Sequence, residues 1–233
     1  MTTDDKTDDM AILGSDSDQS KEYVENYLRE KQAALAALGE TADAQEQACL
    51  RLDIAEAMVG LSRNDEAWEL ARTAFDVFLS MQLWEDAVKC CDVLYQSGQP
   101  ASLVALGQGV WLAVTYPIDP QLSVNMLSYI VDESPANADG AAIAAITAHY
   151  IADIRTEGKR HESLTFLTRE MVANVARDHS GVEGQSAFSE WMEKLQLNDH
   201  EVFLPRLSLV IGAIVPPDQW WFDREKLRSE LPE

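Results

Sequence analysis

The side chains of this chain that are most suited to chemistry are histidines and cysteines, and their spacing matches no catalytic pattern. They are His149, His161, His179, His200, Cys49, Cys90 and Cys91. No HExxH, Glu-x-x-His or CxxC sequence occurs, so the spacings typical of zinc, di-iron and iron–sulfur sites are missing. Neighbouring thiols at 90 and 91 point about 100° apart on a helix, which disfavours a shared metal or a disulfide. We expect no metal, no cofactor, and buried, reduced cysteines.

His149 is the histidine whose surroundings can be read from spacing. Asp153 follows it by one helical turn, so the two side chains could face each other. We interpret His149 as a half-buried histidine with a satisfied hydrogen bond. GxSxG, SxxK, P-loop and GxGxxG sequences are all missing. The sequence therefore predicts no catalytic residues, and an all-α enzyme with a pocket of carboxylates around His149 is kept as an alternative.

The charge balance is strongly acidic. The 233 residues include 40 Asp and Glu against 18 Lys and Arg, which gives a formal net charge of −22. Such a surface repels phosphate backbones and anionic lipids, so we expect neither nucleic acid nor a membrane as partner. The most positive segment holds Arg155, Lys159, Arg160 and His161. We interpret Arg155 as stabilising a helix C-terminus and the other three as solvated.

The N-terminal residues 1–17 are acidic and polar, without the basic start and apolar centre of a signal peptide. Such a composition predicts a disordered acidic tail. The longest apolar run, Leu207 to Pro217, is shorter than the roughly 20 residues that span a bilayer. We therefore expect a cytoplasmic protein.

Apolar residues recur with the helical period in about ten segments, and no alternating run is bounded by hairpin turns. The predicted helices cover residues 20–38, 42–61, 65–80, 83–97, 101–114, 120–132, 139–156, 161–178, 184–197 and 205–215. The predicted fold class is all-α.

The segment Leu61 to Phe75, LSRNDEAWELARTAF, resembles the second helix of a tetratricopeptide (TPR) repeat with its turn. Ala67 and Ala74 match the small residues that this family places seven positions apart, where two helices approach closely. The repeat length of this family is 34 residues, and a step of that length leads from Ala67 to Ala101, which is also small. The same step leads from Ala74 to Gln108, which is not. The resemblance covers at most residues 30–115. It implies a TPR-like α-solenoid of antiparallel helical hairpins whose concave face binds a peptide or a partner's helix.

The sequence thus predicts three parts. Residues 1–17 form the disordered acidic tail, and residues 18–215 form a helical-repeat domain that is TPR-like to about residue 115. Residues 216–233 form an aromatic C-terminal tail. In the TPR-like part, the first helix of each hairpin should line the binding face. Its polar side chains are predicted to contact the partner: Arg51, Asp53, Glu56, Glu85, Lys89 and Asp92.

The C-terminal tail places three aromatic residues beside two prolines. Trp220, Trp221 and Phe222 either fold back to cover the last helices or dock into another protein, as tryptophans in binding hot spots do. Both possibilities stay open at this point.

The predicted function is an intracellular protein–protein interaction adaptor or scaffold without catalysis, which binds a basic or amphipathic segment. An accessory or assembly subunit of a larger complex, such as a multi-subunit metalloenzyme, is the alternative. The sequence leaves the partner, the oligomeric state, and the arrangement of residues 120–215 undetermined.

Overall fold

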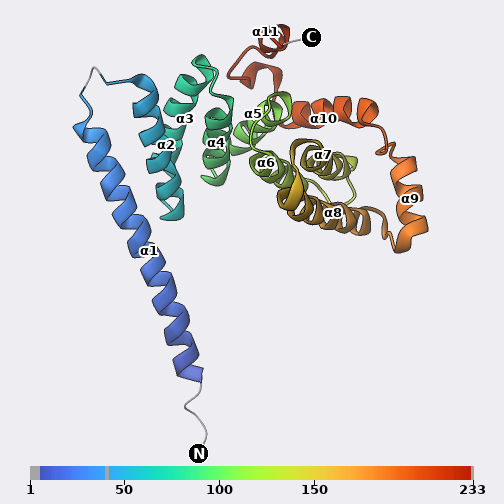
Figure 1. The fold of residues 1–233 in the computed structure, drawn as a ribbon, viewed down its shortest axis with the longest axis horizontal. Coiled ribbons are helices and arrows are strands. Elements are labelled where there is room, and N and C mark those ends of the chain that lie inside the picture. The colour runs from blue at the N-terminus through green and yellow to red at the C-terminus, as the bar shows by residue number, and fades with distance from the viewer. Residues whose placement is uncertain (1–5, 40–41, 232–233) are drawn as a thin grey trace, which may run out of the picture. The chain divides into compact units, whose positions relative to one another are not determined.

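The structure is a computed structural model that describes residues 6–39 and 42–231, with side chains from residue 19 onward. Its described residues contain helices and no strand, so the fold class is all-α, as predicted (Figure 1). The chain divides into two compact units, Met1–Gln99 and Pro100–Glu233, called unit 1 and unit 2 below. This boundary falls inside the domain that the sequence predicted for residues 18–215.

The helices follow one another with short connections. Unit 1 contains α1 (Lys6–Ala37), α2 (Ala44–Gly60), α3 (Asn64–Ser80) and α4 (Trp84–Gln96). Unit 2 contains α5 (Ser102–Thr115), α6 (Pro120–Glu133), α7 (Asp139–Arg155), α8 (Gly158–Ser180), α9 (Gly184–Lys194), α10 (His200–Ile214), the 3-10 helix η1 (Pro217–Gln219) and α11 (Arg224–Ser229). Within the described part of the chain, no helix combines the length and the apolarity needed to cross a bilayer.

Helices α2 to α9 lie within a few residues of the predicted segments, whereas α1 and α10 begin earlier than predicted. Helix α10 begins at His200 and not at Pro205. The Asp199 carboxylate accepts a hydrogen bond from the Glu201 amide at 2.9 Å and caps the helix start. Pro205 inside the helix removes one backbone donor, and the helix continues past it.

Helix α1 begins at Lys6 and not at Ser20; no proline, which would interrupt a helix, occurs between these residues. Of the predicted disordered tail, residues 1–5 lie outside the described residues. Residues 6–17 have helical backbone, and their side chains are not described. Disorder of this tail stays a prediction.

In unit 1, each helix packs on the next in chain order, and α2 also contacts α4. The turns at Ser62 and Gln82 have the same backbone geometry, with φ of 58° at both residues. Each turn is closed by a bond from the following amide to a carbonyl five residues back, as in Schellman motifs. Ala67 and Ala74, the predicted small contacts, are fully buried between the helices. Short, repeated turns thus produce successive antiparallel helices.

In unit 2, helix α7 is the centre of the packing. Helices α6, α8 and α10 all contact it, and most residues from Ala141 to Ala152 are buried. Alanine at many of these positions lets the neighbouring helices approach closely. Helix α10 also contacts α5, far back in the sequence. Residues 120–215 are therefore packed around one buried helix, with contacts beyond those between consecutive helices.

Candidate functional site

The polar residues predicted for partner binding come together mainly on one side of α2 and α4. Helical spacing places Asp53 and Glu56 on one side of α2, and Asp86, Lys89 and Asp92 on one side of α4. The charges of all four other groups act on Glu56, so the two helices contribute to a single surface. Glu85 joins it through Lys89. We call these six residues the acidic face.

Glu56 is the most informative residue of the acidic face. Its side chain is exposed, yet its pKa is raised, first because the protein around it excludes part of the water that stabilises the charged form. The carboxylates of Asp53, Asp92 and Asp86 raise it further, and the Lys89 ammonium lowers it. The face therefore carries more negative charge than its own cation balances.

Lys89 is the basic member of the acidic face. Its Nζ lies 3.1 Å from Asp86 Oδ1 and 3.3 Å from Glu85 Oε1. The pKa of Lys89 is raised: burial, the largest influence, lowers it, but the hydrogen bonds and charges of Asp86 and Glu85 together outweigh burial. Lys89 is thus held by the first turn of its own helix.

Two of the predicted residues have other roles in the structure. Arg51 donates a hydrogen bond to Gln47 at 3.0 Å and lies about 140° around α2 from Glu56, away from the acidic face. Asp53 belongs to the face, but its carboxylate also pairs with Lys31 of α1 at 2.7 Å. Asp86 was missed by the sequence analysis. Its position in the first turn of α4, three residues before Lys89, was the available signal.

The aromatic tail packs on α5 within unit 2. The ring of Trp111 lies 5.3 Å from that of Phe222 and 6.4 Å from that of Trp220, measured between centroids. The Arg224 guanidinium stacks over Trp220 at 4.0 Å. All three tail aromatics, Trp221 included, are half-buried. These contacts favour the capping interpretation of the tail over docking.

Gln108 holds this tail in place. It is fully buried; its amide nitrogen donates to the Gln219 carbonyl at 3.3 Å, and its amide oxygen accepts from the Trp221 backbone N–H at 3.0 Å. Both the nitrogen and the oxygen of this buried amide therefore have a partner, at a position where the 34-residue period predicted a small residue. The neighbouring Gly107 faces Val215 and Ile214 at the end of α10. Helix α5 is therefore adapted to α10 and the tail.

Two arginines of the basic segment, Arg155 and Arg160, bind groups within unit 2. Arg155 donates to the carbonyls of Ala113 at 2.9 Å and Val114 at 3.0 Å, at the C-terminal end of α5. The prediction that it stabilises a helix end identifies the right role, but the helix is α5 and not its own α7. Burial lowers the pKa of Arg155. Arg160 pairs with Asp119, the N-cap of α6.

His149 is half-buried, as predicted, but its hydrogen-bond partner is not Asp153. Its Nδ1 lies 2.9 Å from the hydroxyl of Thr168, a fully buried residue of α8. Asp153 instead lies 3.7 Å from His161 Nε2. Burial lowers the pKa of His149, and the nearby Arg169 charge lowers it further. His149 is therefore neutral near pH 7.

The cysteines and the possible metal ligands are the remaining groups suited to chemistry. Burial raises the pKa of Cys90 and Cys91, so both thiols stay protonated and unreactive. Over residues 19–39 and 42–231, no group of three or more His, Cys, Asp or Glu side chains is placed to hold a metal ion.

Comparisons with protein-family models, with curated proteins and with solved structures found no match. The functional assignment therefore depends on the chemistry of the residues. The TPR resemblance stays a prediction, supported by the burial of Ala67 and Ala74.

Proposed function

We propose that this protein is a protein-binding adaptor or scaffold without catalysis of its own, and that its acidic face holds a basic or amphipathic segment of a partner. The observation that carries this proposal is the gathering of the carboxylates of Asp53, Glu56, Glu85, Asp86 and Asp92 around Lys89; the raised pKa of Glu56 agrees with it. A carboxylate that is short of both water and counter-charge gains free energy when a Lys or Arg approaches it.

The surroundings of Glu56 support a cationic partner over an anionic one. The charges of Asp53 on α2 and Asp92 on α4 both act on Glu56, and Lys89 is held by Glu85 and Asp86. Each charge pair at such a surface contributes little alone. Several pairs formed together steer the encounter and fix the orientation of the partner, and salt weakens them.

A basic amphipathic peptide tests this proposal, with a matched control for net charge. The probe is a fluorescently labelled helical peptide with lysines along one face, and its binding is followed by anisotropy. The test variant carries Glu56→Lys and Asp92→Lys; the control carries Glu66→Lys and Glu69→Lys on exposed positions of α3. Both variants change the net charge equally.

We expect the Glu56→Lys, Asp92→Lys variant to bind the peptide at least about tenfold more weakly, and the α3 variant to bind almost as the parent does. Binding by the parent should weaken between about 50 mM and about 300 mM salt. Equal losses in both variants would mean that the peptide responds only to net charge, and would contradict the acidic face as a site.

The alternative, an accessory or assembly subunit of a larger complex, required the aromatic tail as a permanent interface. Trp220 and Phe222 pack on Trp111 of the same unit, so this observation does not favour the alternative. Purification of the full chain from its native cell at low and at moderate salt distinguishes the adaptor from the accessory subunit. A stoichiometric partner that stays bound at the higher salt favours the accessory subunit.

A further inference from the structure

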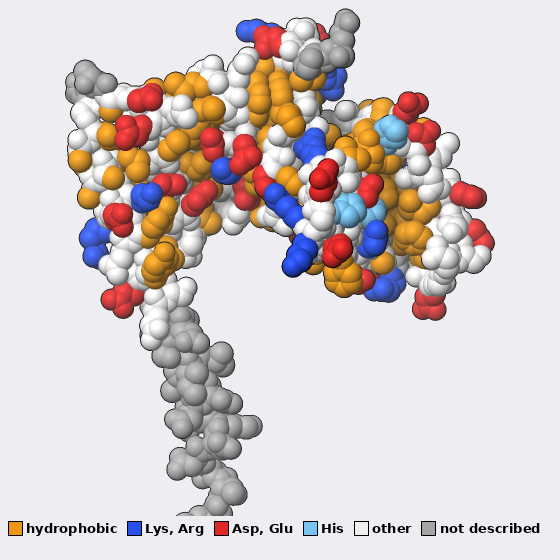
Figure 2. Space-filling view, in the orientation of Figure 1, with side chains coloured by type: hydrophobic (Ala, Val, Ile, Leu, Met, Phe, Trp, Pro, Cys, Tyr) orange, Lys and Arg blue, Asp and Glu red, His pale blue; other side chains and the backbone are white. Residues whose placement is uncertain are grey.

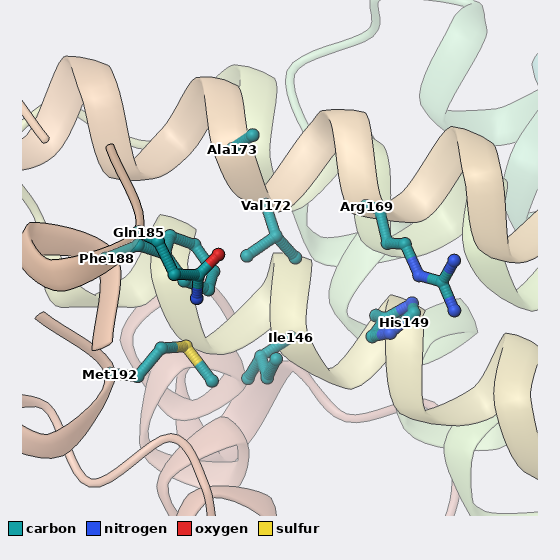
Figure 3. A pocket seen from close by; sticks show the side chains of 8 residues that line it. All are labelled: Ile146, His149, Arg169, Val172, Ala173, Gln185, Phe188 and Met192. Carbon is teal, nitrogen blue, oxygen red and sulfur yellow. The ribbon is translucent and has the colours of Figure 1, made fainter. Parts of the chain in front are cut away.

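Unit 2 contains a pocket between α7, α8 and α9 that the acidic face does not involve. Its volume is about 460 Å³, within the range of small-molecule sites. Ile146 of α7, Val172 and Ala173 of α8, and Phe188 and Met192 of α9 form a mainly apolar end, which also includes the Gln185 amide (Figure 3). His149 and Arg169 lie together at the other end (Figure 3). The pocket thus has an apolar body and a polar, cationic end.

A second cavity of about 340 Å³ continues the pocket beyond His149. It shares Ile146, His149 and Met192 with the first. Its further lining combines the rings of Tyr150 and Phe203 with the polar side chains of Asp153, Asn198 and His200. Figure 2 shows hydrophobic side chains next to histidines on this face of unit 2. The apolar room for a ligand therefore lies in the first cavity, and the space beyond His149 is more polar.

Arg169 differs from the other arginines of unit 2. Arg155 and Arg160 bind carbonyls and a carboxylate, Arg177 and Arg206 bind Asn174 and Asp139, and Arg224 and Arg228 stack on tryptophans. Among the described residues, no carboxylate lies within ion-pair distance of Arg169. In so acidic a chain, an exposed guanidinium at the mouth of an apolar pocket is suited to a carboxylate from outside.

The position of the His149 ring is set by Thr168. The Thr168 hydroxyl donates to the Leu164 carbonyl at 3.0 Å, and its oxygen lies 2.9 Å from His149 Nδ1. Nε2 is the ring nitrogen that Thr168 does not contact. Thr168 is fully buried, which fixes the orientation of the imidazole.

We propose that this pocket binds a small apolar monocarboxylate, with its carboxylate on Arg169 beside His149 and its hydrocarbon part on Ile146, Val172 and Met192. One guanidinium matches one carboxylate, and the apolar end supplies the hydrophobic contribution. The site lies in unit 2, and it stands or falls independently of the acidic face.

A bound carboxylate should also change the titration of His149. The charged groups that act on this imidazole are Arg169 and His161 of α8 and Asp153 of α7. A ligand carboxylate beside Arg169 stabilises the imidazolium, so the pKa of His149 should rise on binding. A ligand held only by apolar contacts would leave that pKa unchanged.

The test uses octanoate as probe and the full chain, with methyl NMR of Ile146, Val172 and Met192 and titration of the His149 ring. Arg169→Gln is the test variant. Arg177→Gln is its control, because Arg177 lies two turns further along α8, is exposed, and carries the same charge. Octanol and octylammonium complete the set as uncharged and cationic probes of the same chain length.

We expect octanoate to shift these methyl signals and raise the pKa of His149, and Arg169→Gln to weaken its binding at least about tenfold. Arg177→Gln should leave the affinity unchanged, and octylammonium should not bind. The proposal is overturned if octanoate leaves the methyl signals unchanged, if it binds both variants equally, or if octanol binds as tightly as octanoate. Failure of peptide binding at the acidic face would not affect any of these outcomes.

Discussion

The two units of this protein use helices in opposite ways. In unit 1, α1 to α4 pack in the order of the chain, and the sides of α2 and α4 carry the charges of the acidic face. In unit 2, three helices surround the buried α7, and α10 returns to α5. Asp and Glu outnumber Lys and Arg by 13 in unit 1 and by 9 in unit 2. An ordered stack presents charge on an exposed surface, whereas a closed bundle forms an apolar pocket.

The difference follows from how far the apolar surface extends around α3 and around α7. In α3, Ala67, Ala71 and Ala74 follow one side, so the helix approaches its neighbours there and leaves its other side to solvent. In α7, alanines cover one side, isoleucines such as Ile143 and Ile146 cover the other, and most residues from Ala141 to Ala152 are buried. A helix that is apolar on one side forms part of a layer, whereas a helix that is apolar all round forms a centre.

The largest expected effect concerns the contact of α10 with α5. Gly107→Val should destabilise unit 2 by about 3 kcal/mol, because the new side chain would overlap Val215 and crowd Ile214. A Cβ added at residue 107 would lie 3.2 Å from the side chain of Ile214. Urea unfolding measures the loss. Since the mutated contact lies within unit 2, hydrogen exchange should show the loss in α5 and α10 more than in α2 and α3.

Gly140→Ala provides the control for this prediction. A Cβ at Gly140 of α7 would lie 3.6 Å from Val210, an ordinary contact, so we expect a gain of about 0.5 kcal/mol from helix propensity. Similar losses for Gly107→Val and Gly140→Ala would show that close packing against α10 does not distinguish these glycines.

A smaller effect is expected where the tail covers α5. Gln108→Leu leaves the Trp221 N–H and the Gln219 carbonyl without their partner, at a cost of about 2 kcal/mol. Faster amide exchange at Trp221 and earlier proteolysis near residue 219 are the measurements. Gln121→Leu, on the exposed side of α6, is the control and should change neither.

These residues also mark the limit of what the sequence alone could predict. The helical period of about 3.6 residues made some features predictable. These are the positions of the helices, the burial of Ala67, and the side of α2 that Asp53 and Glu56 share. The bonds of Gln108 to Gln219, Arg155 to Ala113 and His149 to Thr168 join residues 111, 42 and 19 positions apart. They depend on which helix packs beside which, and no local pattern contains that information.

The smallest expected effect distinguishes the two candidate sites by the sign of their pH dependence. Glu56→Gln and His149→Gln each remove one titrating group, one from the acidic face and one from the pocket. Burial raises the pKa of Glu56 above 4.5 and lowers that of His149 below 6.5. The free energy of unfolding of each variant, relative to the parent, is measured from pH 4 to pH 8.

The Glu56 carboxylate lowers the free energy of unfolding of the parent when it is charged in the folded protein. This happens at pH values above the pKa of Glu56 in the folded state. Glu56→Gln should therefore be more stable than the parent at pH 7, by about 0.5 kcal/mol or less at so exposed a site, and the gain should vanish as the pH falls below 4.5.

For His149 the unfolded chain takes up a proton near pH 6.5 before the folded protein does. His149→Gln should thus gain relative to the parent as the pH falls from 6.5, while above that pH only the lost bond to Thr168 remains. If the stability difference from the parent changed with pH in the same direction for both variants, the acidic face and the pocket would not differ electrostatically as described.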